Sequence, residues 1–318
     1  MTIENIFLQV TENKEPQLLY QPIQYILMQS GKRLRPRLVL LATELFNGNT
    51  EKSLPVAAAF EMLHNFTLIH DDIMDNAPVR RGKETVYKKW NSNIAILSGD
   101  ALATMALQQL LNVEIDNDRR AEIISLFAKT SLEVCEGQQY DLNFETSESV
   151  SIDDYFTMIR LKTAVMLAGC LKAGAIFAGA NKQSQDRLYE FGIHLGLAFQ
   201  LKDDLLDIYA DHEIFGKMKG LDIQDNKKTY LYLRALQDAF PEDRIALQRL
   251  FTVSDITFEE KLGKTIALYE KLSIKEKTEN VISELVEKGV AILQKIETNN
   301  EKKNEIILYA KQLTDRNK

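Results

Sequence analysis

Residues 53–75 read SLPVAAAFEMLHNFTLIHDDIMD, and this stretch decides the fold class. Its apolar residues recur at helical spacing, Ser53 fits an N-cap and Pro55 falls in the first turn, so one long helix is predicted over 53–73. The same spacing recurs along most of the chain. The further predicted helices cover 94–111, 119–140, 152–179, 184–208 and, with a high charge, 258–313.

The composition supports long helices. Only 14 of the 318 residues are glycine and 6 are proline, well below the roughly 12% that the two make up in average chains. So few breakers argue against a many-stranded sandwich or a TIM barrel. Hydrophobic residues make up 45%, enough for a substantial core. No convincing strand alternation, fixed repeat or low-complexity linker is present, so a single all-α domain over 1–318 is predicted.

Charge and cysteine content exclude several classes of protein. The chain carries 39 Lys and Arg against 46 Asp and Glu, a net charge of −7, which makes it a poor nonspecific nucleic-acid binder. Two cysteines, Cys135 and Cys170, cannot build a disulfide framework, and no CxxC pair exists for zinc. Residues 1–16 lack the pattern of a signal peptide. The Ala- and Gly-rich run 164–180, interrupted by Lys172, predicts a buried helix that a neighbour approaches closely. We therefore expect a cytoplasmic protein with no stable membrane insertion.

Two clusters of aspartate share one pattern, DDIMD at 71–75 and DDLLD at 203–207. Residues four apart lie on one face of a helix, so the outer aspartates of each cluster should point together. The middle ones, Asp72 and Asp204, are turned about 100° away. A single aspartate cluster of this kind is often only part of a solvated helix face. Two clusters in apolar surroundings instead favour a functional site. The paired carboxylates are Asp71 with Asp75 and Asp203 with Asp207.

Oxygen ligands in this number suit Mg²⁺, which keeps several waters and is usually completed by substrate phosphate. No pair of the 4 histidines has transition-metal spacing. Basic residues supply the other half of an anion site. The segment GKRLRP at 31–36 sets Lys32 and Arg35 three apart, and Arg80-Arg81 begins five residues after Asp75. Guanidinium groups match phosphate oxygens, so a polyphosphate ligand is indicated.

With these aspartate clusters and basic segments, the sequence resembles the trans-isoprenyl diphosphate synthases over roughly residues 25–230. Several ordered motifs are far more specific than one DDxxD, whereas the C-terminal region matches only as charged helices. The motifs are GKRLRP at 31–36, HNFTLIHDDIMDNAPVRRG at 64–82, SGDAL at 98–102, GQQYD at 137–141, LKT at 161–163, FQLKDDLLD at 199–207 and GKMKGLDIQDNKKT at 216–229.

The resemblance implies a role for each matching residue. Mg²⁺, three ions per site, would be held by Asp71, Asp75, Asp203 and Asp207. The allylic diphosphate would be contacted by Arg80, Lys162, Lys217 and Lys227. Isopentenyl diphosphate would be held by Lys32, Arg35, His64 and Arg81. The catalytic residues beside the reacting carbon would be Lys162, Thr163 and Gln200, while His70 has no matching role and is interpreted as structural.

The resemblance also implies a fold and a reaction. The fold would be a large bundle of mostly antiparallel helices around a deep central cavity, the isoprenoid synthase fold. The reaction would be an Mg²⁺-dependent ionisation, condensation and elimination that adds isopentenyl diphosphate to dimethylallyl, geranyl or farnesyl diphosphate. The product would be geranylgeranyl or farnesyl diphosphate, and the enzyme a homodimer.

Phe66 is the candidate for setting product length. It lies five residues before Asp71, somewhat more than one helical turn, and points broadly along the path of the growing tail. A large ring there should block extension. An aromatic residue at this position, with no insertion inside DDIMD, resembles geranylgeranyl synthases, although plain core packing remains an alternative.

Three other functions compete with this interpretation. A class I terpene cyclase shares the all-α architecture, but it usually has an Asn/Ser/Glu metal motif instead of DDLLD and does not need GKRLRP. A non-catalytic subunit of a heteromeric prenyl synthase would be expected to lose an aspartate motif or the basic residues. A phosphohydrolase of the HD type is suggested only by His70-Asp71, and its further histidine ligands are absent.

Overall fold

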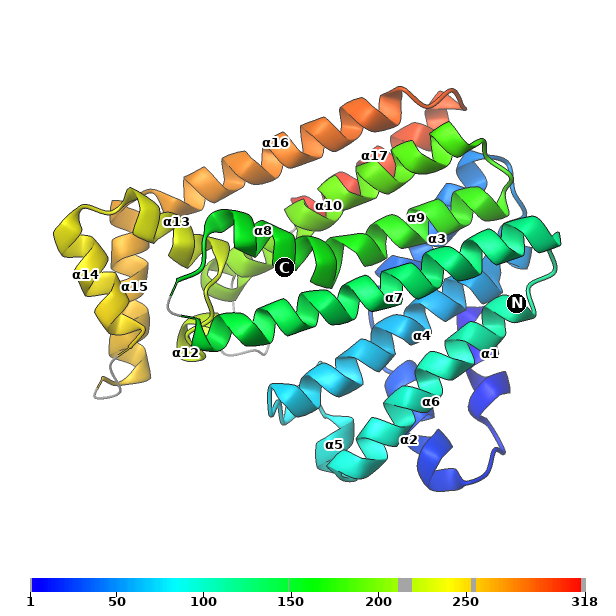
Figure 1. Cartoon of the computed structure of the whole chain (residues 1–318), viewed down its shortest axis with the longest axis horizontal. Helices are drawn as coiled ribbons and strands as arrows, with labels where there is room; N and C mark the ends of the chain where they lie inside the picture. The colour runs from blue at the N-terminus through cyan, green and yellow to red at the C-terminus, as the bar shows by residue number, and fades with distance from the viewer. Residues whose placement is uncertain (1, 148, 211–218, 253–255, 316–318) are drawn as a thin grey trace. The chain divides into compact units, whose positions relative to one another are not determined.

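The computed structural model describes residues 2–147, 149–210, 219–252 and 256–315, and these are almost entirely helical (Figure 1). The predicted all-α class is therefore confirmed. The elements are α1 (Ile3–Thr11), α2 (Gln17–Leu27), α3 (Leu34–Leu45), α4 (Thr50–Met74), β1 (Val79–Arg80), β2 (Lys83–Glu84), α5 (Val86–Lys89), α6 (Ser92–Leu111), α7 (Asn117–Thr146), α8 (Ile152–Ile159), the π-helical segment η1 (Arg160–Ala164), α9 (Val165–Phe177), α10 (Lys182–Tyr209), α12 (Leu221–Gln224), α13 (Tyr230–Asp238), α14 (Pro241–Leu250), α15 (Phe258–Lys271), α16 (Ile274–Gln294) and α17 (Asn300–Thr314).

The chain forms two compact units. The first comprises Met1–Ser131, Gly169–Tyr189 and Ile296–Lys303, and the second comprises Leu132–Ala168, Glu190–Lys295 and Asn304–Lys318. The long helices α7 and α10 contribute residues to both units.

Helix α4 is the centre of the first unit and packs most extensively against α6 and α3. Residues 56–63 of this helix are all buried, which explains why they are apolar almost without interruption. The helix starts earlier than predicted. Asn49, not Ser53, is the N-cap, since its side chain accepts a hydrogen bond of 3.0 Å from the Lys52 amide. Ser53 is buried inside the helix.

The second unit is built around a core to which α8, α10, α13, α14, α15 and α16 contribute. Its fully buried side chains include Leu201, Leu231 and Leu247. The aromatic residues Tyr155 and Tyr269 are also buried there. Because this core reaches the end of α10, the second aspartate motif begins on a rigid support.

The buried helix predicted at 164–180 is present as α9, which spans Val165–Phe177. Most of α9 is fully buried, and a Cβ added to Gly174 would lie 2.2 Å from the Val39 carbonyl oxygen of α3. The small side chain therefore allows the two helices of the first unit to approach closely.

Two local predictions were wrong. The expected single helix over 152–179 changes to π-helical winding at η1 before it continues as α9. The sequence shows no convincing strand alternation, yet the stretch after DDIMD contains a two-stranded antiparallel hairpin in which Val79 pairs with Glu84. Strands of two residues are too short to produce an alternating sequence pattern.

Helix α6 is the one helix of the described residues that is long and apolar enough to cross a membrane by length and composition alone. About a third of its apolar window is buried, and the helix packs against α4 and α2. Its exposed apolar residues are Ile96, Leu97, Leu107 and Leu111.

Candidate active site

The first aspartate motif lies at the C-terminal end of α4, in the first unit. Asp72 is completely buried, and Arg80 Nε donates a 2.7 Å hydrogen bond to its carboxylate. Burial raises the pKa of Asp72, although the Arg80 charge acts in the opposite direction. Asp75 is exposed and Asp71 is partly buried. The motif thus uses its middle carboxylate structurally and leaves the outer pair accessible.

Arg80 and Arg81 stand on the hairpin that follows α4. Arg81 and Gly82 form its turn, with φ of 53° and 74°. Residues other than glycine rarely adopt such positive φ values. The Arg81 guanidinium covers Gly31, where an added Cβ would lie 2.8 Å from Nη1. The hairpin therefore lies against the loop that carries the predicted basic segment.

His64 lies among cationic groups. Desolvation lowers its pKa well below the ordinary value, and the charges of Arg35, Arg81, Arg80 and Arg33 lower it further, in that order. Because an imidazole in such surroundings stays neutral near pH 7, His64 can donate one hydrogen bond to an anion while the guanidinium groups supply the charge. Three of these four arginines belong to the predicted diphosphate sites.

Arg33 fixes the start of α3. It adopts a left-handed conformation with φ of 45°, its Nη1 contacts buried Glu61 at 3.0 Å, and its Nη2 donates to the Leu27 carbonyl at 2.6 Å. The neighbouring Lys32 is exposed and Arg35 is partly buried. Arg33, which is not among the predicted ligand residues, thus anchors the segment that carries Lys32 and Arg35.

Phe66 is partly buried on α4, and its ring meets His70 edge to face with centroids 4.8 Å apart. His70 Nε2 lies 3.3 Å from the Ile96 carbonyl of α6. A Cβ on Gly99 would lie 2.4 Å from that ring nitrogen, so the glycine makes room for the imidazole. His70 therefore supports the ring of Phe66, in agreement with its structural interpretation.

The second aspartate motif lies near the end of α10, in the second unit, and repeats the arrangement of the first. Asp203 and Asp207 are partly buried, whereas Asp204 is only 5% exposed. The Asp204 carboxylate accepts hydrogen bonds from Tyr155 Oη at 2.5 Å, Gln200 Nε2 at 3.2 Å and the Tyr230 amide at 3.3 Å.

Burial shifts the pKa of several groups in this region. Desolvation raises the pKa of Asp204 to about 7, against the hydrogen bonds that favour its charged form. The pKa of Asp222 is raised well above its ordinary value, by burial first and then by the charges of Asp207 and Asp204. The Asp222 amide donates to Asp207 Oδ2 at 3.2 Å. The cluster of carboxylates therefore favours a bound cation.

The π-helical segment η1 carries the predicted catalytic pair Lys162 and Thr163. A Cβ on Gly137 of α7 would lie 2.2 Å from the Lys162 amide nitrogen, and one on Gly196 of α10 would lie 2.4 Å from the Ala164 Cα. Two glycines thus allow this widened turn to fit between two helices of the second unit. Segments of π-helix occur frequently at functional sites.

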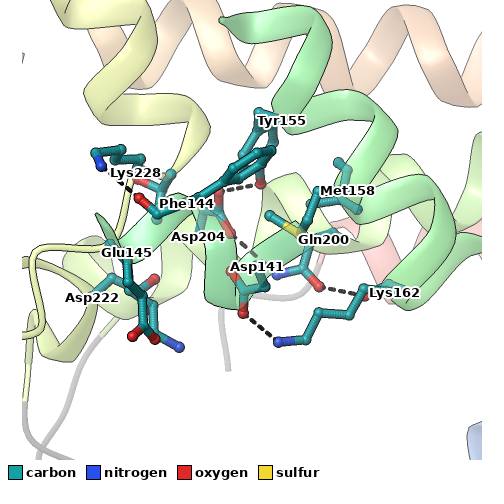
Figure 2. Close-up of a pocket in the computed structure, with 14 residues that line it drawn as sticks. Asp141, Phe144, Glu145, Tyr155, Met158, Lys162, Gln200, Asp204, Asp222 and Lys228 are labelled. Atoms are coloured by element: carbon teal, nitrogen blue, oxygen red, sulfur yellow. Dashed lines mark hydrogen bonds and ion pairs between the residues drawn. The ribbon is translucent and has the colours of Figure 1, made fainter. Parts of the chain in front are cut away.

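The side chains of η1 have defined partners. Lys162 Nζ lies 2.5 Å from Asp141 Oδ2, and Thr163 Oγ1 donates to Gln200 Oε1 at 2.9 Å. All three predicted catalytic residues are therefore near one another. They line a cavity of about 100 Å³ in the second unit, which Figure 2 shows. Its lining residues are Asp141, Phe144, Glu145, Tyr155, Met158, Ile159, Lys162, Thr163, Gln200, Asp204, Asp222, Lys227, Lys228 and Thr229.

The cavity adds residues that the sequence analysis did not select, namely Asp141, Tyr155, Asp222 and Lys228. Asp141, Asp222 and Lys228 fall inside motifs that carry the resemblance, which was the available signal. Tyr155 belongs to none of them. The predicted ligand residue Lys227 lines the cavity, whereas Lys217 lies outside the described residues.

The available donor set fits an Mg²⁺ ion whose coordination is completed by substrate. In the part of the chain that the structure describes, no three His, Cys, Asp or Glu side chains are grouped to hold a metal by themselves. Each motif instead offers two accessible carboxylates one turn apart. Mg²⁺ usually takes one or two protein carboxylates and fills its remaining positions with water and substrate phosphate.

Comparison with known protein families matches residues 16–269 to the polyprenyl synthetase family. A curated relative, the geranylgeranyl diphosphate synthase of Methanosarcina mazei, is 37% identical over 274 residues, 86% of this chain and 82% of its own. The geranylfarnesyl diphosphate synthase of Natronomonas pharaonis is 32% identical over 302 residues, 86% of this chain and 89% of its own.

The fold is also similar to solved structures. A crystal structure of a geranylgeranyl pyrophosphate synthase superposes with a TM-score of 0.92 at 40% identity, covering 99% of this chain and 98% of the other. The enzyme from Pyrococcus horikoshii also gives 0.92, at 32% identity, covering 99% and 95%. These relatives do not favour a terpene cyclase or a non-catalytic subunit. The chain belongs to the polyprenyl synthetase family and is a short-chain prenyltransferase.

Proposed function

We propose that this enzyme condenses isopentenyl diphosphate with an allylic diphosphate and produces geranylgeranyl diphosphate. One observation carries the proposal. In both aspartate motifs the middle carboxylate is buried and hydrogen-bonded, while the outer two remain accessible. A solvated helix face would not bury the same member of the motif twice.

Three Mg²⁺ ions would be held by Asp71, Asp75, Asp203 and Asp207. When bound, the metal supplies Lewis-acid stabilisation of the diphosphate leaving group. The fixed cations around the allylic diphosphate would be Arg80, Lys162, Lys227 and Lys217. The hydrogen bond from Arg80 Nε to Asp72 orients the guanidinium, so its terminal nitrogens can serve phosphate oxygens.

Isopentenyl diphosphate would be bound by Lys32, Arg35, His64 and Arg81. Neutral His64 would donate a hydrogen bond, and the lysine and the arginines would balance the charge of the diphosphate. Arg33 would take no phosphate, because Glu61 and the Leu27 carbonyl already occupy its guanidinium.

The reaction would proceed in three steps. Cleavage of the allylic carbon–oxygen bond releases diphosphate and leaves an allylic cation, which the oxygen atoms of Thr163 and Gln200 stabilise as fixed dipoles. The double bond of isopentenyl diphosphate attacks that cation and forms the new carbon–carbon bond. The resulting cation loses a proton to the departing diphosphate, and the product is one isoprene unit longer.

Phe66 would stop extension once the tail reaches its ring. The curated relative from Methanosarcina mazei is named for geranylgeranyl diphosphate, which supports this product over farnesyl diphosphate.

We also propose a soluble, cytoplasmic homodimer. Helix α6 exposes Leu97 at 60% and Leu111 at 53%, and exposed apolar side chains gathered on one helix are typical of an interaction surface. The packing of α6 on α4 and α2 supports this assignment over membrane insertion.

The direct test incubates the enzyme with labelled isopentenyl diphosphate, Mg²⁺ and each of dimethylallyl, geranyl and farnesyl diphosphate. Product length is then measured by chromatography and mass spectrometry. Geranylgeranyl diphosphate from all three starters is expected, and none after chelation of the metal. Cyclic hydrocarbons formed without consumption of isopentenyl diphosphate would contradict the proposal.

The division into two diphosphate sites has its own test. Arg35→Ala should raise the KM for isopentenyl diphosphate more than the KM for the allylic substrate, and Arg80→Ala should do the reverse. Equal effects of both variants on both substrates would show that the division is wrong.

A further inference from the structure

A chain of hydrogen bonds runs through the second unit from a buried tyrosine to the predicted catalytic threonine, and Figure 2 labels its members Tyr155, Asp204 and Gln200. Tyr155 Oη donates to Asp204 Oδ2 at 2.5 Å, and Gln200 Nε2 donates to Asp204 Oδ1 at 3.2 Å. Thr163 Oγ1 in turn donates to Gln200 Oε1 at 2.9 Å. Three elements therefore meet in this chain, α8 with Tyr155, α10 with Asp204 and Gln200, and η1 with Thr163.

The chain defines which end of the Gln200 amide faces Thr163. Both oxygens of the Asp204 carboxylate accept hydrogen bonds, Oδ2 from Tyr155 Oη and the Tyr230 amide and Oδ1 from the NH₂ group of Gln200, so Asp204 selects the NH₂ end of the amide. The amide oxygen is then turned toward Thr163, whose hydroxyl supplies the matching donor. Reversal of the amide would bring its oxygen against the carboxylate and its NH₂ group toward the reacting centre.

Asp204 is itself held in place and differs from the accessible aspartates beside it. It is 5% exposed, and Tyr155 Oη and the Tyr230 amide both donate to its Oδ2. Tyr155 is 2% exposed and packs within the core of the second unit. Two groups outside the aspartate motif, Tyr155 Oη and the Tyr230 amide, therefore hold the Asp204 carboxylate in position.

We propose that Tyr155 and Asp204 are positioning residues that fix the amide of Gln200, so that the oxygens of Gln200 and Thr163 stay directed at the reacting carbon. This rests on the proposed function of Thr163 and Gln200. Oxygen dipoles held in advance stabilise positive charge that develops during ionisation and is absent from the bound substrate. Loss of this fixed orientation of the oxygens should lower kcat and leave KM nearly unchanged.

The first test is Tyr155→Phe, which removes one hydroxyl and keeps the ring. We expect kcat to fall about tenfold, the effect of losing one hydrogen bond to a charged group, with both KM values within about twofold of the wild type. Tyr232→Phe is the matched control. Tyr232 is also buried in this core, where its ring packs on Phe251 with centroids 4.2 Å apart, and its variant should retain full kcat.

A double-mutant cycle separates positioning from a general structural effect. If Tyr155 acts through Gln200, Tyr155→Phe should cause no further loss of kcat in a Gln200→Ala background. Additive losses would overturn the proposal, and so would a Gln200→Ala variant with wild-type kcat.

A spectroscopic measurement tests the position of the Gln200 amide without relying on turnover. The Gln200 side-chain NH₂ signals, assigned by their disappearance in Gln200→Ala, should exchange slowly with solvent in the wild type and rapidly in Tyr155→Phe. Unchanged exchange would overturn the positioning role. Failure of the wild type to transfer prenyl groups would instead overturn the proposed function and leave this readout valid.

Discussion

At the scale of single residues, the members of each aspartate motif have different tasks. Asp75 is exposed and Asp71 is partly buried, whereas Asp72 is buried against Arg80. The two outer carboxylates are therefore the ones proposed to bind a ligand, whereas Asp72 stabilises the fold.

If Asp71 holds the metal as proposed, Asp71→Ala should lower kcat by several orders of magnitude and leave the melting temperature nearly unchanged, because the variant loses a proposed metal ligand at an accessible position. Asp72→Ala should instead lower the free energy of unfolding by about 1–3 kcal/mol, because Arg80 loses a buried partner. Calorimetry and steady-state kinetics on both variants check this. Near-normal turnover of Asp71→Ala with Mg²⁺ would remove the basis for the metal assignment.

Phe66 is predicted to set product length. Phe66→Ala should yield longer prenyl chains, since the tail can pass the position of the ring. The variant should lose less than the about 3–5 kcal/mol typical of a fully buried phenylalanine, because Phe66 is only partly buried.

Phe60→Leu is the control for this prediction. Phe60 is fully buried on the same helix and packs on Phe127, so its variant should lose stability without a change in product. Product lengths are compared by mass spectrometry. An unchanged distribution in folded Phe66→Ala would mean that another residue limits the chain.

His64 links stability to pH. Its pKa in the folded protein lies well below the ordinary value, so below about pH 6.5 the unfolded chain binds a proton that the folded protein does not. Its contribution is fully present above that pH and is lost as the pH falls. Wild type should lose about 1 kcal/mol more than His64→Gln between pH 7 and pH 5.5 in urea titrations. Parallel curves for the two proteins would exclude this role.

At the scale of elements, close helix contacts bring η1 to the cavity. Gly137→Ala would place a Cβ 2.2 Å from the Lys162 amide nitrogen, so α7 and η1 must move apart. We expect a loss of about 1–3 kcal/mol in stability and a large fall in kcat, because Lys162 and Thr163 are displaced.

Gly263→Ala provides the control. Gly263 is exposed within α15 and an added Cβ meets nothing within 4 Å, so alanine should stabilise the helix by up to about 1 kcal/mol. Thermal melts and kinetics of the two variants compare the same chemical change at a tight and an open position. Equal behaviour would show that the contact at Gly137 is not needed.

At the scale of the whole molecule, the exposed apolar residues of α6 predict association. Leu97→Glu should convert a dimer to a monomer in light scattering after gel filtration, since a charge would be buried at the interface. Leu308→Glu is the matched control, with a side chain 59% exposed against 60% for Leu97. A Leu97→Glu protein that stays dimeric would place the interface elsewhere.

Much of the architecture could be predicted from the sequence, because helical periodicity and the shortage of glycine and proline are local properties. The all-α class, the existence of α4, α6, α7 and α10 and the buried run 164–180 are confirmed. Helix ends were less accurate, since a cap such as Asn49 competes with Ser53 four residues away. The hairpin after α4 and the π-helical winding of η1 leave no periodic signal.

The sequence by itself determined which chemistry the chain carries. Spacing of four residues sets the outer aspartates of each motif on one face, and ordered basic motifs identify the family. The tertiary structure alone decided which carboxylates are buried, which lysine pairs with Asp141, and that Tyr155 reaches Asp204. These contacts join residues 21 and 49 positions apart. No local pattern encodes such pairings, because they depend on how helices pack and not on how each one winds.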